Sequence, residues 1–106
     1  MLKPIKEVIE FKPDFCILCL KEDSTEIVKV ADGFLPFRIL NTLFNSEKDN
    51  FDLDEEKAIS QKRNYNEILG KTGLSNDLIK TLFIIHNKKI TLRKAVDINK
   101  IRNLIK

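Results

Sequence analysis

Residues 65–83 read Tyr-Asn-Glu-Ile-Leu-Gly-Lys-Thr-Gly-Leu-Ser-Asn-Asp-Leu-Ile-Lys-Thr-Leu-Phe, and this stretch decides the expected fold. Gly73 can adopt the positive φ that ends a helix. Leu74 is expected to fill the gap between two helices. The hydroxyl of Ser75 can accept a hydrogen bond from an amide in the first turn of the next helix. The stretch therefore predicts two short helices joined by a tight turn. Three further apolar residues are expected in the core, namely Ile68, Ile79 and Leu82.

This pattern resembles the helix-turn-helix of winged-helix DNA-binding domains, and the resemblance extends over residues 65–96 if the wing is included. It departs from the family at Leu69, where family members usually carry a small residue because the two helices cross closely. The resemblance implies an α+β winged-helix-like domain that binds DNA. The alternative is an ordinary pair of helices joined by a Gly-Leu-Ser turn inside an α-rich domain.

The residues after the turn do not decide where the second helix ends. Residues 78–85 are apolar almost all round, whereas a helix lying in a DNA groove keeps a polar outer face. Either Ile84 and Ile85 belong to a strand that turns at Asn87-Lys88, or this face buries against a partner subunit. The alternating residues 88–94 then predict a basic wing strand, with Ile90 and Leu92 facing inward and Lys89, Thr91 and Arg93 facing outward. Asp97 is expected to cap a final helix.

The chain before residue 65 is expected to begin with a β-hairpin. A continuous apolar run predicts one strand over 12–22, covered on both faces, and residues 26–30 predict its partner. Pro36 is expected as the first residue of a helix that runs to about Asn45. Asp52 or Asp54 is expected to cap a further helix whose first turn is acidic. The sequence thus predicts a single domain, 1–106, with a β-hairpin region at 1–34 and a helical, winged-helix-like region at 35–106.

Charge is divided unevenly along the chain. Residues 1–56 hold seven basic and thirteen acidic residues, whereas residues 57–106 hold twelve basic and three acidic ones, and the total is +3. The asymmetry favours one surface built for a polyanion. The alternative is that the halves fold against each other so that their charges partly cancel. The acids at 49–56 could also shield a nucleic-acid surface or engage a basic protein.

The composition argues against a membrane, metal or secreted protein. No stretch approaches the roughly 18–20 apolar residues of a membrane span, and the first residues lack the apolar core of a signal peptide. Cys16 and Cys19 have the spacing of a zinc half-site but lack a second pair, so we expect two buried thiols in a cytoplasmic protein. The sequence does not decide whether they share a metal across a dimer.

The function predicted from these features is DNA binding by a small transcriptional regulator, without a cofactor or metal and with a homodimer as one arrangement. The candidate nucleic-acid-binding residues are Ser75, Asn76, Lys80, Thr81, Lys88, Lys89, Arg93 and Lys94, with added backbone contacts from Lys62, Arg63 and Lys71.

Two other functions stay open. The first is a protein-interaction module, or a subunit or inhibitor of a nucleic-acid-processing complex, that binds through the acidic loop and an apolar helix. The second and weaker one is a metal-dependent nuclease using Asp14, Glu26 and Lys29. We do not expect an enzyme, because His86 has no catalytic companion in the sequence.

Overall fold

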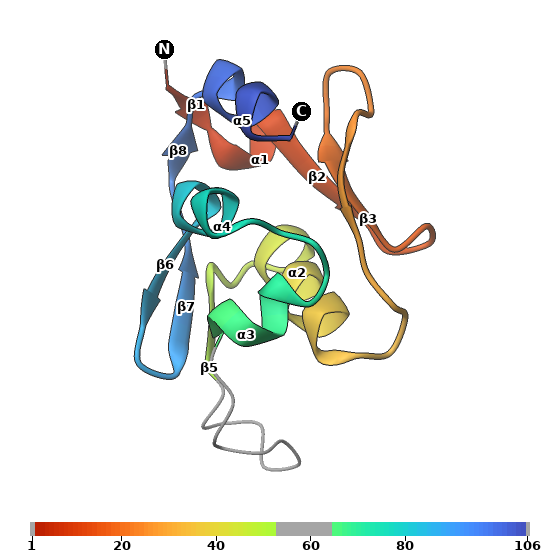
Figure 1. Cartoon of the computed structure of the whole chain (residues 1–106), viewed down its shortest axis with the longest axis vertical. Coiled ribbons are helices and arrows are strands. Elements are labelled where there is room, and N and C mark those ends of the chain that lie inside the picture. Colours follow the sequence, from red (N-terminus) through yellow and green to blue (C-terminus); the bar gives the residue numbers. More distant parts are fainter. Residues whose placement is uncertain (1, 53–64, 106) are drawn as a thin grey trace.

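The computed structural model describes residues 2–52 and 65–105 as an α+β fold, which confirms the predicted class (Figure 1). Its helices are α1 (Ile5–Val8), α2 (Leu35–Asn45), α3 (Tyr65–Gly70), α4 (Asn76–Leu82) and α5 (Ile98–Leu104). Its strands are β1 (Lys3–Pro4), β2 (Ile9–Lys12), β3 (Ile17–Leu20), β4 (Glu26–Lys29), β5 (Asn50–Asp52), β6 (Phe83–His86), β7 (Lys89–Leu92) and β8 (Ala95–Val96).

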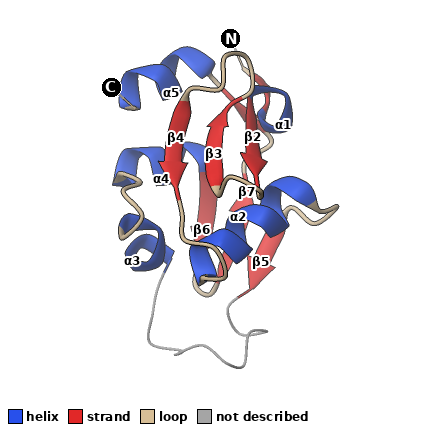
Figure 2. Ribbon diagram, turned by 90° about the vertical axis from the view of Figure 1, so that its right-hand side faces the viewer, coloured by secondary structure: helices blue, strands red, loops and turns tan. Residues whose placement is uncertain are grey.

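The strands form three small antiparallel sheets. One has the order β2-β3-β4, a second has the order β5-β7-β6, and β1 pairs with β8 to join the two ends of the chain. Figure 2 shows the β2-β3-β4 sheet in front of the β5-β7-β6 sheet. Helix α2 contacts β2 on one side and β5 on the other, so it links the two larger sheets.

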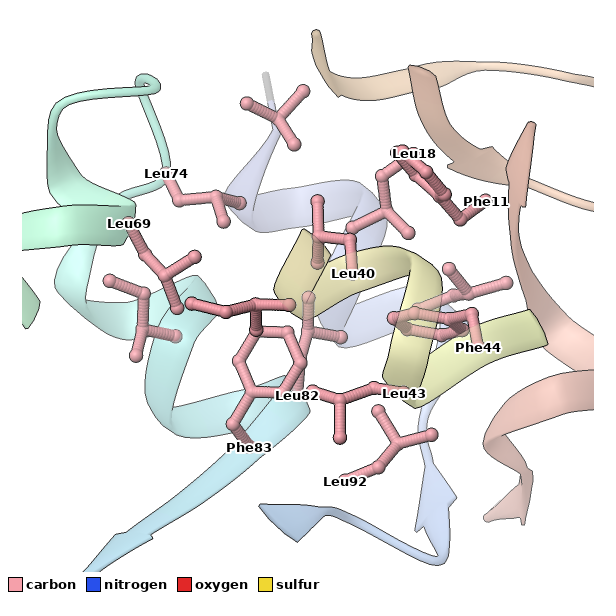
Figure 3. Close-up of a cluster of buried hydrophobic side chains, with 14 of the residues drawn as sticks. Phe11, Leu18, Leu40, Leu43, Phe44, Leu69, Leu74, Leu82, Phe83 and Leu92 are labelled. Atoms are coloured by element: carbon pink, nitrogen blue, oxygen red, sulfur yellow. The ribbon is translucent and has the colours of Figure 1, made fainter. Parts of the chain in front are cut away.

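One hydrophobic core extends across both regions of the chain. Leu40, Leu43 and Phe44 of α2 lie between residues of the β2-β3-β4 sheet and residues of α3, α4 and β6–β7 (Figure 3). Leu40 and Leu43 are fully buried because the apolar residues of α2 recur at helical spacing. Helix α2 begins at Leu35, so Pro36 occupies its second position rather than the predicted first.

The β-hairpin predicted for the first region is present as β3 and β4, but the predicted strand over 12–22 is wrong at its start. Pro13 to Cys16 form a tight turn between β2 and β3, in which Phe15 N donates to Lys12 O at 3.2 Å and Cys16 has φ of 56°. Proline cannot donate to a strand ladder, which favours a turn at this point. Phe15 is therefore 65% exposed instead of covered on both faces.

Strand β4 contains a β-bulge. Leu18 pairs with Val28 whereas Cys19 pairs with Glu26, which leaves Ile27 as the extra residue. The bulge changes the alternation of side chains, so Glu26 and Lys29 lie on the same face of the sheet. In a regular strand without a bulge, residues three apart would face opposite sides of the sheet.

The described part of the region at 35–106 follows the predicted order of elements, with two differences. Strand β7 ends at Leu92, and Ala95–Val96 pair with β1 instead of extending the wing. Strand β5, which the sequence did not predict, pairs with β7 through Phe51 and Ile90. The helix expected after Asp52 or Asp54 lies outside the described residues, as do Lys62 and Arg63.

Candidate nucleic-acid interface

The turn between α3 and α4 has the geometry that its sequence predicts. Gly73 has φ of 105°, and Leu74 is only 3% exposed. The hydroxyl of Ser75 accepts a hydrogen bond from Leu78 N at 3.2 Å and so caps α4. The expected core contacts Ile68, Ile79 and Leu82 are buried, and Leu69 is buried with them.

Helix α4 passes directly into strand β6, which decides between the two alternatives for the end of the helix. Helix α4 ends at Leu82, and Phe83 begins β6, so Ile84 and Ile85 belong to a strand. The first of the two alternatives, in which Ile84 and Ile85 form a strand that turns at Asn87-Lys88, is therefore confirmed. The apolar residues of α4 face the core, and its outer face carries Asn76, Asp77 and Lys80, all exposed.

Thr81 is less available than the other predicted residues of α4. It is half-buried, and its hydroxyl donates to Asp77 O at 2.7 Å inside the helix. This back-bond uses the only proton that the hydroxyl can donate. Its oxygen can still accept a hydrogen bond, but Asn76 and Lys80 are the better placed donors on this face.

The register of the β5-β7-β6 sheet defines an outward row of side chains. Lys89 lies between Asp52 and His86, and Thr91 lies between Asn50 and Ile84. These outward positions are exposed or half-buried, whereas Phe83, Ile90 and Leu92 are buried on the inner face, as predicted for Ile90 and Leu92. Asp52 and Lys89 are therefore cross-strand partners on the outer face.

Arg93 joins this sheet to α4. Its Nε donates to Lys80 O at 2.7 Å, and its backbone N donates to Leu82 O at 3.0 Å. These bonds place the guanidinium at the carboxyl end of α4, where the helix dipole favours a cation. Lys80 and Arg93 line one surface hollow of about 310 Å³. Asn66 and Ile84 line the same hollow and were not among the predicted nucleic-acid-binding residues.

Basic residues also lie just beyond both ends of β7 in the sequence. Lys88 follows Asn87, whose φ of 54° makes the tight turn predicted there. The hydroxyl of Tyr65 lies 2.6 Å from Lys88 O and 2.9 Å from Phe51 O, which fixes this turn against α3 and β5. At the other end, Lys94 is exposed and lines a neighbouring hollow of about 240 Å³ together with Lys6 and Asp49.

Among the described residues, several lysines of this region form no ion pair with an acid, whereas Lys12 and Arg102 elsewhere in the molecule do. In the part of the chain that the structure describes, the ammonium groups of Lys80, Lys89 and Lys94 take part in no ion pair. By contrast, Lys12 contacts Glu10 at 3.5 Å, and Arg102 contacts Glu22 and Asp23 at 3.2 and 2.9 Å. The paired cations lie on or against β2 and the β3–β4 turn. Within the described ranges, unpaired lysines occur on other surfaces as well, among them Lys29 and Lys71, so this region is distinguished by the closeness of its cations to the polar face of α4.

The two cysteines occupy different surroundings. Cys19 is buried, and burial raises the pKa of its thiol above the usual 9.0. Cys16 is half-buried, and its Sγ lies 3.7 Å from Pro13 O. Among residues 2–52 and 65–105, His, Cys, Asp and Glu side chains form no group of three or more that could hold a metal.

Comparison with protein-family models, with curated proteins and with solved structures found no match. None of the helices in the described ranges has the length and apolar character needed to cross a bilayer. The activity of the chain must therefore be inferred from its own residues.

Proposed function

We propose that the protein binds duplex DNA as a winged helix-turn-helix domain, with α4 as the recognition helix. The order of elements from α2 to β7, in which β5, α3, α4 and β6 follow one another, supports this proposal. So does the direct passage of α4 into β6, because it sets the β6–β7 hairpin beside the second helix of the turn. Hairpin β6–β7 would then be the wing.

The observation that carries the proposal is the convergence of unpaired cations beside the polar face of α4. Lys80 and Arg93 line one hollow, and Asn76 lies one helical turn before Lys80 on the same face. In the proposed complex Asn76 reads an adenine edge, and Lys80 and Arg93 contact phosphate or guanine. The DNA backbone on either side is contacted by Ser75, Lys88, Lys89 and Lys94. The hydroxyl oxygen of Thr81 accepts a hydrogen bond from the DNA.

As a small transcriptional regulator, the protein would act by occupying its DNA site. A homodimer would place two α4 helices on half-sites about 34–36 Å apart, one turn of B-DNA. A pseudo-palindromic target would then match the two-fold axis of the protein.

Paired charge reversals test the proposal. We expect the double variant Lys80→Glu, Arg93→Glu to lose at least about tenfold in affinity for a labelled mixed-sequence duplex in fluorescence anisotropy at low salt. The matched control is Lys3→Glu, Lys21→Glu, which changes the net charge equally at two exposed positions outside α4 and the β5-β7-β6 sheet. Equal losses in the two variants would contradict a localised DNA surface.

One observation favours the second candidate function, a protein-interaction module. Ile84 is 49% exposed in the same hollow as Lys80 and Arg93. A protein partner could bury this side chain, whereas a phosphate backbone gains little from it. Ile84→Ser should leave DNA affinity nearly unchanged under the main proposal. If Ile84→Ser abolishes the biological function while the charge reversals preserve it, the partner is a protein.

A further inference from the structure

A second basic hollow lies between the start of α2 and the turn that joins α3 to α4. Its volume is about 330 Å³, and its lining includes Lys29, Phe34, Lys71 and Thr72. The lining holds two lysines and no carboxylate. Figure 1 shows the α3–α4 turn passing beside α2, which brings residues about forty positions apart in the sequence to one place.

The side chain of Phe34 is exposed to solvent, unlike the phenylalanines of the core. It is 66% exposed, although the next aromatic residue, Phe37, packs edge-on against Phe11 with ring centroids 5.3 Å apart. The backbone of Phe34 is held on both sides, because its N donates to Ala31 O at 3.4 Å and its O accepts from Arg38 N at 3.2 Å. The ring therefore faces solvent, and hydrogen bonds hold the backbone that carries it.

The two lysines of this hollow are available for an anionic ligand. Both side chains are exposed, and neither forms an ion pair or a side-chain hydrogen bond within the described ranges. Lys71 precedes Asn76 by five residues, so it lies within about 18 Å of the first residue of α4. Asp14 and Asp32 are exposed on loops at this end of the molecule but do not line the hollow.

We propose that this hollow holds an unpaired nucleotide next to the bound duplex. The base stacks on Phe34, and the flanking phosphates contact Lys29 and Lys71. An aromatic ring beside cationic side chains is the usual platform for a single strand, and a paired base inside a duplex offers no free face to such a ring. The inference rests on the proposed function, because it supposes that α4 lies on duplex DNA. The preferred ligand is then a duplex that carries a single-stranded extension.

The test compares blunt and tailed duplexes of one sequence by fluorescence anisotropy, with the tail placed at either strand end. We expect roughly tenfold tighter binding of one tailed duplex, in line with the stacking of one base on an aromatic ring. Phe34→Ala should remove this preference and leave the affinity for blunt duplex unchanged. The matched control is Phe15→Ala, because Phe15 is equally exposed but does not line the hollow.

A second measurement reports the stacking itself. The chain has no Trp and one Tyr, so 2-aminopurine in the tail can be excited without interference from the protein. Its fluorescence should change on binding to the native protein and to Phe15→Ala but not to Phe34→Ala.

The outcomes separate this inference from the proposed function. Equal binding of blunt and tailed duplexes, or a tail preference that survives Phe34→Ala, overturns the inference and leaves duplex binding intact. Failure to bind either duplex removes the proposed function as well. Weaker binding of tailed duplex by Lys29→Ala, with blunt duplex unaffected, would support the assignment of the phosphate contact, because Lys29 lines the hollow and is not among the proposed duplex contacts.

Discussion

At the scale of single residues, Ser75 serves both the fold and the proposed function. Its hydroxyl caps α4, and the same end of α4 is proposed to face DNA phosphates. Ser75→Ala should lower the free energy of unfolding by about 1 kcal/mol, measured by urea denaturation. Ser75→Asp should retain the stability, because aspartate also caps helices, but should weaken DNA binding through phosphate repulsion. Equal DNA affinity of Ser75→Asp and the native protein would place the phosphates elsewhere.

Asp77 is the residue of α4 that opposes the proposed function. It is exposed on the outer face beside Asn76 and Lys80, so its carboxylate repels phosphate. We expect Asp77→Asn to raise the affinity for duplex DNA several-fold at low salt and by less at higher salt, because salt screens the repulsion. Anisotropy titrations at both salt concentrations measure this difference. A loss of affinity would show that Asp77 makes a favourable contact, for example with a cytosine amino group.

At the scale of secondary-structure elements, Tyr65 connects α3 to the sheet. The side chain is fully buried, and its hydroxyl lies within hydrogen-bonding distance of carbonyls in β5 and in the β6–β7 turn. Tyr65→Phe leaves these acceptors without their partner and should destabilise the fold by about 1–3 kcal/mol. Circular dichroism during urea denaturation measures the change. An unchanged midpoint would mean that water replaces the hydroxyl.

Helix α5 is tied to the β3–β4 turn by Arg102, which contacts Glu22 and Asp23. Hydrogen bonds from the Thr25 hydroxyl and amide, at 2.7 and 3.1 Å, and then the bond to Arg102, hold the pKa of Asp23 below its usual 3.8. The stability that Asp23 contributes is therefore complete above pH 3.8 and is lost as the pH falls through the lowered value.

Urea denaturation near pH 5 and near pH 3 tests this dependence. Asp23→Asn should lower the stability more at the higher pH, so the loss of stability on acidification should be smaller in this variant than in the native protein. Asp32→Asn is the control, because Asp32 is exposed and forms no ion pair within residues 2–52 and 65–105. If Asp23→Asn and Asp32→Asn respond alike to pH, Asp23 does not stabilise the turn.

The elements that could be predicted from the sequence are those with a strong local signal. Helix α2 has apolar residues at helical spacing, and the α3–α4 turn has a glycine, a leucine and a capping serine in the required order. Strand β5 was missed because its signal is one apolar residue, Phe51, between polar neighbours. The bulge at Ile27 was missed because it depends on pairing with β3, which local spacing does not reveal.

The candidate site was predictable in part. Lys80 and Arg93 were expected from their charge and their place near the turn, and they line one hollow. The hydrogen bond from Arg93 Nε to Lys80 O depends on the tertiary path of the chain after β7 and could not be predicted. Asn66 and Phe34 carry no sequence signal of their own, because a single polar or aromatic residue in a loop or on a short helix has many structural explanations.

At the scale of the whole molecule, the proposed DNA surface depends more on which basic side chains lack an ion-pair partner than on how charge is divided along the chain. The first half is acidic and the second half basic, yet basic residues occur at both ends of the structure. Lys12 and Arg102 are paired with acids, whereas Lys80 of α4 and Lys89 of β7 form no ion pair in the described ranges. This arrangement gives the proposed DNA surface its local positive potential although the net charge is only +3.

The most direct test of duplex binding is an anisotropy titration of a labelled mixed-sequence duplex with the native protein at about 50 and 200 mM salt. If about five to eight phosphates are contacted, log affinity should fall against log salt concentration with a slope of roughly −5 to −7. Binding at low salt with such a slope is the result that we predict. The absence of binding at 50 mM salt would contradict the proposal that α4 and the β6–β7 hairpin form a DNA surface.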